Sequence, residues 1–294
     1  MLVDTHSHLN FKAYDKDRDE VIKRTQKEGV VCIDVGTKYE TSKRAIELAE
    51  QNENIFAAVG MHPIHIKTDL MKLKMDEEEG AFEPLGEEYD KEKYKRLVLE
   101  DRKKAEGSER SRRIVAIGEI GLDYYYLPKK NTVEQFSAQG GPASGWKELQ
   151  RKVFVQQLDL AKELNLPVIV HCRMAHEDVL KILGDYSGVK GTIHCFTGNW
   201  EEAQKYMDLG FYLGINGIIF KFNIDEVIKK AALDKILVET DCPYLTAPQA
   251  GPKGTRNEPA FVKHVVQKIA DLKGVTFDEV ASATTQSAQK LFKI

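Results

Sequence analysis

Eight short apolar segments recur along the chain, and they constrain its fold more than any other feature. They are MLVDT (1–5), VVCIDVG (30–36), IFAAVG (55–60), RIVAIGEIG (113–121), PVIVHC (167–172), GTIHC (191–195), FYLGIN (211–216) and KILVETD (235–241). They are rich in Val and Ile without regular polar alternation, which is typical of strands buried on both faces. Between them lie stretches with helical periodicity, such as 16–29, 42–52, 148–165 and 257–274.

Strands that alternate with helices predict a parallel sheet with helical crossovers. Eight such units within 294 residues fit an α/β fold, a single (β/α)8 barrel of the TIM type, with 1–294 as one domain. A doubly wound open sheet is the alternative, but no GxGxxG follows the first apolar segment. We therefore predict the barrel.

Two segments interrupt the alternation of strands and helices. Residues 67–113 form a charge-dense insertion before the fourth strand. Within it, residues 90–106 have a helical pattern, and we predict a solvated helix with a mobile acidic loop rather than a partner-binding site. Residues 137–146, SAQGGPASGW, are glycine-rich but lack the GK[ST] of a phosphate-binding loop. We predict a flexible connection there.

Composition excludes several classes of protein. A net charge of −3, from 43 basic and 46 acidic residues, argues against a broadly basic nucleic-acid-binding surface, although not against a local one. The sequence after Met1 lacks the charged segment followed by an apolar segment that is typical of a signal peptide. No apolar run approaches the roughly 18 residues of a membrane span. The four cysteines include no CxxC pair. We expect a reduced, cytoplasmic protein without an obligate protein partner.

Ionisable side chains stand where most of the predicted strands end. They are His6, His8, His62, His65, Glu119, Asp123, His171, His194, Glu239 and Asp241. His6 and His8 are two residues apart, so in a strand their side chains share one face. In a barrel all ten lie at the C-terminal mouth, where active sites are built. Such groups are costly to bury without partners, and their recurrence at the ends of several strands predicts a metal site.

The residue types indicate the metal chemistry. Histidines with carboxylates suit Zn²⁺, Mn²⁺ or Fe²⁺, and an all-oxygen Mg²⁺ shell is less natural. Four histidines and two carboxylates make six ligands, which is more than one open catalytic zinc requires. This number favours two divalent ions that share a bridging carboxylate. Such a pair clamps the attacking and leaving oxygens of phosphoryl transfer and lowers the pKa of bound water.

Seven motifs occur in a fixed order: THSHL (5–9), VGMHP (59–63), IGEIGLDYY (117–125), VIVHCR (168–173), IHCFTG (193–198), ETDCPYL (239–245) and TRNEP (255–259). Together they resemble the TatD-type metal-dependent deoxyribonucleases of the amidohydrolase superfamily, over the whole chain except the two insertions. The resemblance implies that His6, His8 and Asp241 hold one ion, that His171 and His194 hold the second, and that Glu119 bridges them. It also implies hydrolysis of DNA phosphodiester bonds from the 3′ end of a single strand.

Asp241 is our candidate for the proton acceptor during attack, and Glu119 is the other residue to which we assign a catalytic role. His62 is expected near the site as a substrate contact rather than a ligand, with His65 as an ordinary loop residue. Arg173 follows His171 by two residues and suits a bidentate grip on phosphate.

Arg256 and Lys253 are weaker candidates for phosphate contacts. One of the three tyrosines at 124–126 is a candidate for base stacking, although core packing is the simpler role. Cys172, Cys195 and Cys242 adjoin proposed ligands but are expected on the opposite face of each strand, as small buried residues.

Three functions remain open. They are a metal-dependent 3′–5′ exodeoxyribonuclease, an acyl hydrolase such as a D-aminoacyl-tRNA deacylase, and a non-enzymatic metal-binding barrel. Cyclic-amide hydrolases of the superfamily commonly bridge their metals with a carboxylated lysine from strand four, where this chain has Glu119 and no lysine. This difference favours phosphodiester chemistry, and an open mouth argues against a purely structural metal site.

Overall fold

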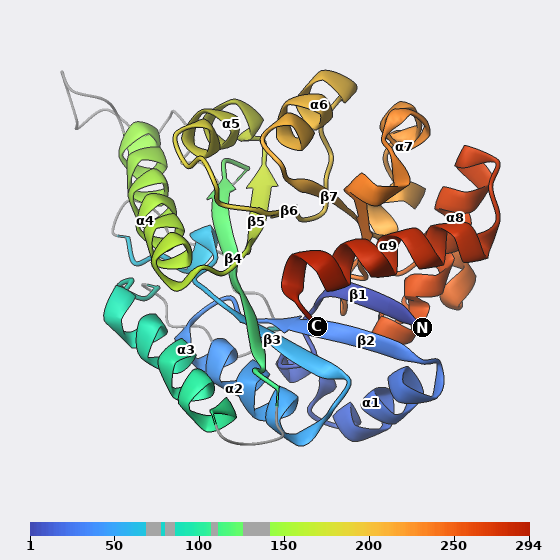
Figure 1. Cartoon of the computed structure of the whole chain (residues 1–294), viewed down its shortest axis with the longest axis horizontal. Helices are drawn as coiled ribbons and strands as arrows, with labels where there is room; N and C mark the ends of the chain where they lie inside the picture. Colours follow the sequence, from blue (N-terminus) through green and yellow to red (C-terminus); the bar gives the residue numbers. More distant parts are fainter. Residues whose placement is uncertain (69–77, 80–85, 107–110, 126–141) are drawn as a thin grey trace.

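The structure is a computed structural model that describes residues 1–68, 78–79, 86–106, 111–125 and 142–294 (Figure 1). Its eight strands pair in parallel in the order of the sequence. They are β1 (Leu2–Ser7), β2 (Val30–Val35), β3 (Ile55–Val59), β4 (Ile114–Asp123), β5 (Val168–Arg173), β6 (Gly191–Ile193), β7 (Tyr212–Ile215) and β8 (Ile236–Val238). Each lies within or overlaps one of the eight predicted segments, and the predicted (β/α)8 barrel is confirmed.

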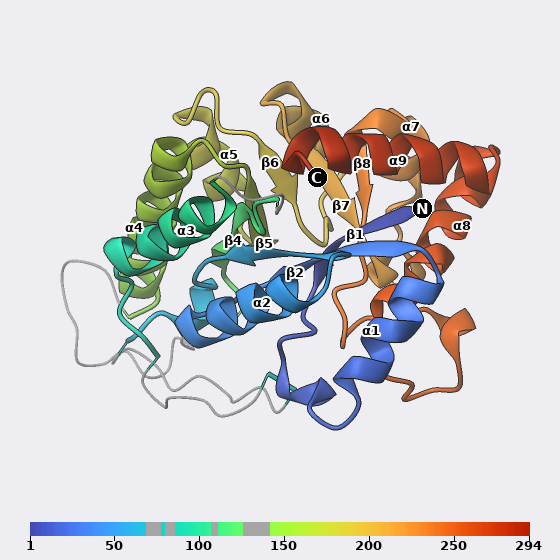
Figure 2. The same ribbon diagram turned by 60° about the horizontal axis from the view of Figure 1, so that its bottom comes forward.

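The helices lie outside the strands, as Figure 1 shows. They are α1 (Arg18–Lys27), α2 (Tyr39–Gln51), α3 (Lys91–Ala105), α4 (Pro142–Leu164), α5 (His176–Gly184), α6 (Trp200–Asp208), α7 (Asp225–Lys230), α8 (Val262–Lys273) and α9 (Phe277–Phe292). The turned view places α1 and α2 outside β2 and β3 (Figure 2). Their buried residues face the sheet, as the periodicity of the predicted helices requires.

The first and last strands meet at the C-terminal mouth of the barrel. Ser7 forms a parallel bridge with Cys242. The Asp241 amide donates to the His6 carbonyl at 2.8 Å, and the His8 amide donates to the Cys242 carbonyl at 3.0 Å. These contacts bring the segment after β8 directly beside the two histidines of the first motif.

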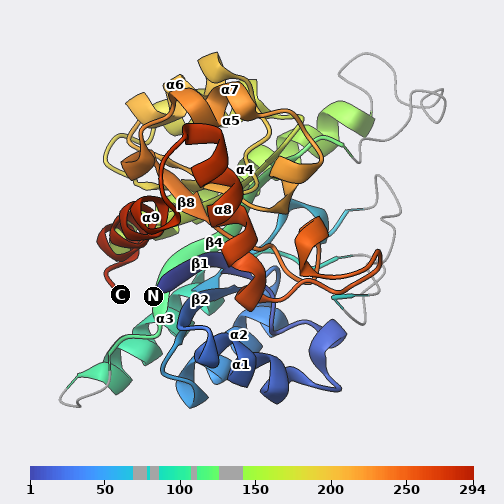
Figure 3. The same cartoon turned by 90° about the vertical axis from the view of Figure 1, so that its right-hand side faces the viewer.

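The opposite end of the barrel is covered by the C-terminal helix. Leu291 of α9 lines a surface hollow together with Pro167, Lys190 and Tyr212, which stand where β5, β6 and β7 begin. Figure 3 shows α9 beside β8, near the N-terminal end of β1. The C-terminal mouth is therefore the end at which side chains from several strands can form a site.

The structure corrects the prediction that the helix within residues 67–113 is a solvated one. The predicted helix is present as α3, but Tyr94 and Val98 on one of its faces are buried. It is the crossover helix between β3 and β4, and it is an ordinary part of the barrel. Of the acidic segment that precedes α3, the structure describes residues 67–68, 78–79 and 86–90, whereas 69–77 and 80–85 lie outside the described residues.

The prediction of a flexible connection at 137–146 is partly wrong. Residues 142–146 form the first turn of α4, and Trp146 is fully buried. Burial of this large side chain favours helix over an open glycine-rich loop. Residues 137–141 lie outside the described part of the chain. Within the described part, no helix is both long and apolar enough to cross a membrane.

Candidate metal centre

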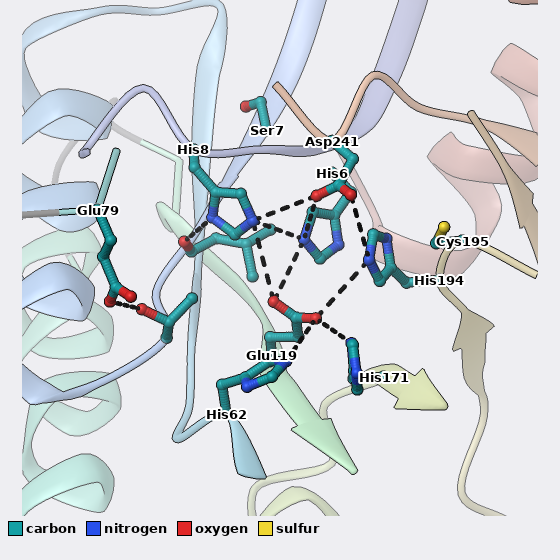
Figure 4. Close-up of polar contacts among 12 residues, drawn as sticks. His6, Ser7, His8, His62, Glu79, Glu119, His171, His194, Cys195 and Asp241 are labelled. Carbon is teal, nitrogen blue, oxygen red and sulfur yellow. Dashed lines mark hydrogen bonds and ion pairs between the residues drawn. The ribbon is translucent and has the colours of Figure 1, made fainter. Parts of the chain in front are cut away.

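Five polar side chains, those of His6, His8, His171, His194 and Asp241, surround Glu119 at the mouth of the barrel (Figure 4). On one side, His6 Nε2 and His8 Nε2 are 3.0 Å apart. Glu119 Oε2 lies 3.5 Å from His6 Nε2 and 3.9 Å from His8 Nε2. Asp241 Oδ1 lies 3.8 Å from His6 Nε2 and 3.5 Å from His8 Nε2. This part of the site combines two imidazoles from β1 and the loop after it with one carboxylate that follows β8.

The other Glu119 oxygen faces the second pair of histidines. His171 Nδ1 lies 2.8 Å from Glu119 Oε1, and His194 Nε2 lies 3.7 Å from the same oxygen. His194 Nε2 is also 3.9 Å from Asp241 Oδ2. Glu119 thus presents one oxygen to each pair of imidazoles, which is the arrangement expected of a carboxylate between two cations.

The donor set fits divalent metal ions. Several groups of three side chains have ligand atoms that all lie within 4.8 Å of one another. Three of these groups are His6, His8 and Asp241; Glu119, His171 and His194; and His62, Asp123 and His171. Imidazole nitrogens with carboxylate oxygens suit transition metals. The buried carboxylate of Glu119 and the partly buried one of Asp241 also need positive charge nearby, which a divalent cation supplies.

Neighbouring groups hold the outward nitrogens of three histidines. His8 Nδ1 lies 2.9 Å from the Val35 carbonyl, which can only accept, so the proton is on Nδ1 and Nε2 is available as a ligand. His171 Nε2 lies 3.1 Å from Asp123 Oδ2, and His194 Nδ1 lies 2.8 Å from Glu239 Oε1. Such partners fix the ring orientation and raise the basicity of a metal ligand.

The electrostatics of the site favour charged carboxylates. Burial alone would raise the pKa of Glu119, but the surrounding imidazoles, His62 and His6 foremost, hold it well below its usual range. Burial likewise opposes ionisation of Asp241, yet His194 and a hydrogen bond with His8 lower its pKa. Burial would lower the pKa of His171, but its bonds to Asp123 and Glu119 raise it to about 9. Metal binding must therefore displace protons from this site.

Asp241 occupies an unusual backbone position. β8 ends at Val238, and Asp241 has a φ of 56°, in the left-handed region. A short polar side chain tolerates this conformation better than most, and the hydrogen bond to the His6 carbonyl fixes it. The strand-end pattern of the sequence located Asp241 correctly at the mouth, although it lies beyond the strand itself.

The metal-centre residues other than the fully buried His6 line a cavity of about 300 Å³. Its walls also contain seven further residues, of which Arg173 ends β5 and the others lie between the strands: Phe11, Thr37, Ile64, His65, Glu79, Arg173 and Tyr244. Because the cavity is open, a substrate can reach the ligand atoms, unlike in a closed structural metal site.

Two of the predicted substrate contacts line this cavity. His62 Nε2 lies 3.4 Å from Glu119 Oε1, and His62 Nδ1 accepts from the Ile64 amide at 3.2 Å. Burial lowers the pKa of His62 to about 3, so its imidazole is neutral at neutral pH. Arg173 lines the cavity and stacks its guanidinium 3.8 Å from the ring centroid of Tyr125.

The structure does not bring Arg256 to the cavity. Its guanidinium forms a bidentate ion pair with Asp17, with N–O distances of 3.0 and 2.7 Å, and also donates to the Ala13 carbonyl. A fork already filled by a carboxylate is a poor phosphate ligand, so we no longer assign Arg256 this role. Lys253 is exposed and is likewise absent from the cavity walls.

The tyrosines and cysteines at the motifs divide by environment. Tyr124 is buried and donates to Asp178, whereas Tyr125 is 55 % exposed. Tyr126 lies outside the described residues.

Cys172 and Cys242 are buried as predicted. The expectation for Cys195 is wrong, because its thiol lies within 4.8 Å of ligand atoms of His194 and Asp241. β6 ends at Ile193, so strand alternation does not apply at Cys195.

Glu79 and Thr37 are cavity residues that the sequence did not reveal. Glu79 belongs to a run of acidic residues, and nothing in that run distinguishes it from its neighbours. Asp123 and Glu239 were recognised as strand-end groups, but their contacts with His171 and His194 could only be seen in three dimensions.

Comparison with known proteins agrees with this site. The family described as TatD related DNase matches residues 3–293. The chain belongs to the TatD family. An uncharacterized metal-dependent hydrolase of Bacillus subtilis, YabD, is 39 % identical over 300 residues that cover 100 % of both chains. TatD of Escherichia fergusonii, named a 3′-5′ ssDNA/RNA exonuclease, is 30 % identical over 302 residues that cover 100 % of this chain and 99 % of the other.

Solved structures of TatD proteins share the fold. YjjV of Escherichia coli K12, a TatD homolog, has a TM-score of 0.76 at 26 % identity and covers 100 % of this chain and 98 % of its own. A TatD family hydrolase of Entamoeba histolytica has a TM-score of 0.73 at 22 % identity, covering 99 % and 97 %. The resemblance inferred from the motifs is confirmed, and this TatD family member is a metal-dependent hydrolase.

Proposed function

We propose that the chain is a 3′–5′ exonuclease that hydrolyses the phosphodiester bonds of single-stranded DNA. The observation that carries the proposal is the convergence of His6, His8, His171, His194 and Asp241 on Glu119 at an open cavity. The name of the Escherichia fergusonii relative supports a single-stranded nucleic acid as substrate. Arg173 in the cavity wall supplies a fixed positive charge for a phosphate.

In this proposal, His6, His8 and Asp241 would hold one divalent ion, His171 and His194 would hold a second, and Glu119 would contribute to both sites. When bound, such ions lower the pKa of water and neutralise charge on the phosphate. Arg173 orients the scissile phosphate. His62, neutral and protonated at Nε2 because Nδ1 accepts from Ile64, donates a hydrogen bond to substrate.

Asp241 lines the cavity and accepts a proton from the attacking water as its oxygen bonds to phosphorus. The bond to the leaving 3′ oxygen then breaks, and the proton passes to that oxygen. A carboxylate with a lowered pKa is a weak base, so this transfer occurs only as the water becomes acidic during attack.

The test uses metal-reconstituted protein with 5′-labelled single-stranded DNA, and separately with D-aminoacyl-tRNA. We expect progressive shortening of the DNA from its 3′ end. Asp241→Asn should retain near-normal metal content and lose about 10²–10⁴ in rate, the usual effect of removing a general base. Asp278→Asn, an exposed residue of α9, is the matched control. Deacylation without DNA cleavage would replace the nuclease by the acyl hydrolase, and inactivity on both substrates would favour a non-enzymatic barrel.

A further inference from the structure

Glu79 lies in the wall of the cavity that contains the metal-centre residues, but apart from them. Its neighbours in the wall are Phe11, Thr37 and His65, from the loops after β1, β2 and β3, whereas Arg173 ends β5. Figure 4 shows Glu79 at the left, away from Glu119 and the histidines around it. The cavity therefore has an arginine in one part of its wall and a carboxylate in another.

The Glu79 carboxylate is held by a defined set of contacts. His65 Nε2 lies 2.7 Å from Oε2, and the Thr37 hydroxyl donates to Oε1. Lys38 Nζ is more distant, at 3.9 Å from Oε1. The backbone is fixed as well, because Lys12 donates its amide to the Glu79 carbonyl at 3.3 Å.

Glu79 is an ionised acceptor at neutral pH. Its side chain is 5 % exposed. Burial alone would raise the pKa of Glu79, but His65 and the Thr37 hydroxyl lower it to about 2. A carboxylate offers about four lone-pair sites, and the hydrogen bond from Thr37 and the ion pair with His65 occupy two of them. The group can therefore accept a further hydrogen bond from a molecule in the cavity.

Glu79 is not positioned as a metal ligand. It belongs to none of the candidate metal-binding groups found among the described residues. Two imidazoles separate it from Glu119: the His65 and His62 ring centroids are 6.1 Å apart, and His62 Nε2 lies 3.4 Å from Glu119 Oε1. A substrate whose phosphate reaches the metal centre would extend another group toward Glu79.

We propose that Glu79 accepts a hydrogen bond from the free 3′-hydroxyl of the terminal nucleotide and thereby selects strand ends; this assignment rests on the exonuclease function proposed above. An exonuclease must recognise a group that every terminal nucleotide carries. The bases do not provide one, because thymine presents no amino donor where adenine and cytosine do. The 3′-hydroxyl is the donor common to all unmodified DNA and RNA ends.

The same carboxylate disfavours a continuing strand. A phosphate attached to the 3′ oxygen has no proton to donate and brings a second negative charge toward Glu79. Like charges at short range in a partly desolvated site repel strongly. Glu79 would thus favour cleavage at the end of a strand over cleavage within it.

The experiment compares two single-stranded oligothymidylates that differ only in a 3′-hydroxyl or a 3′-phosphate. For the metal-reconstituted wild type, we expect kcat/KM to be at least about tenfold higher for the 3′-hydroxyl strand. The reason is that the 3′-phosphate strand lacks one hydrogen bond to a charged group. Glu79→Gln should reduce this ratio by about tenfold, because the amide is uncharged and can donate to phosphate. Glu79→Asp, which keeps the charge but shortens the side chain, should reduce it less.

Glu78→Gln is the matched control. It removes one negative charge from the same segment, but the Glu78 side chain is exposed and absent from the cavity wall. The ratio should therefore match the wild type. As a readout independent of turnover, fluorescence anisotropy of the metal-free protein should show the same preference for the 3′-hydroxyl strand, again reduced in Glu79→Gln.

The outcomes separate this assignment from the proposed function. If the wild type hydrolyses neither strand, the exonuclease function fails and the assignment fails with it. If it hydrolyses both strands equally, or if Glu79→Gln slows both by the same factor, the nuclease function stands. Glu79 would then only anchor its segment to Thr37 and His65.

Discussion

At the scale of single residues, three histidines of the metal centre are each fixed by a partner on the outward nitrogen. Val35 holds His8, Asp123 holds His171, and Glu239 lies against His194. The sequence placed the ligands at one mouth because strand ends converge there in a barrel. It could not show which nitrogen of each ring faces inward, because ring orientation depends on contacts between residues more than 25 positions apart.

Glu239 offers a direct test of this orientation. Its Oε1 accepts from the Cys195 amide at 2.7 Å and from Asn216 Nδ2 at 3.1 Å, and lies 2.8 Å from His194 Nδ1. Glu239→Gln preserves the shape but removes the charge that raises the basicity of His194. Metal affinity should fall by about 10–100-fold, as is usual when such a partner is replaced. Competition with a chelator measures the change, with the exposed Glu226→Gln as control, and an unchanged affinity would refute the orienting role.

At the scale of elements, the strands and the helix α3 were predictable, but the buried face of α3 was not. Strands buried on both faces give apolar segments that stand out in the sequence. α3 has only Tyr94, Val98 and Asp101 buried, so its many charges obscured the apolar face. The position of Glu79 in the cavity wall could not be predicted for a similar reason. In the sequence it is one carboxylate among several, and only the fold shows that it contacts His65.

The link between α3 and β4 depends on Asp101. Its carboxylate accepts from the amides of Arg113, at 3.0 and 3.2 Å, and Ile114, at 3.1 Å. A carboxylate near the C-terminal end of a helix is mildly unfavourable, but losing that of Asp101 would leave two amides without this acceptor. Asp101→Ala should therefore lower the free energy of unfolding by about 2–4 kcal/mol. Urea denaturation measures this, and Glu100→Ala, exposed on the same helix, should change it little.

At the scale of the whole molecule, the barrel gathers ligands from strands that are far apart in sequence. His6 and Asp241 are separated by most of the chain. Because β1 meets the segment after β8, His6 Nε2 and Asp241 Oδ1 are only 3.8 Å apart. The ordered motifs were enough to predict this, because barrel closure fixes which segments meet. The net charge of −3 was also informative, since it limits how strongly a polyanion can be attracted.

The salt dependence of DNA binding follows from this charge distribution. Each phosphate neutralised on a single strand contributes a slope of about −0.7 to log K against log salt. Arg173 lines the cavity, whereas the guanidinium of Arg256 is already paired with Asp17. We expect a total slope of about −0.7, measured by fluorescence anisotropy of an oligothymidylate with metal-free protein over a potassium chloride series. Arg173→Gln should bring the slope close to zero, and Arg256→Gln should leave it unchanged. A wild-type slope steeper than about −4 would require a basic groove elsewhere on the barrel.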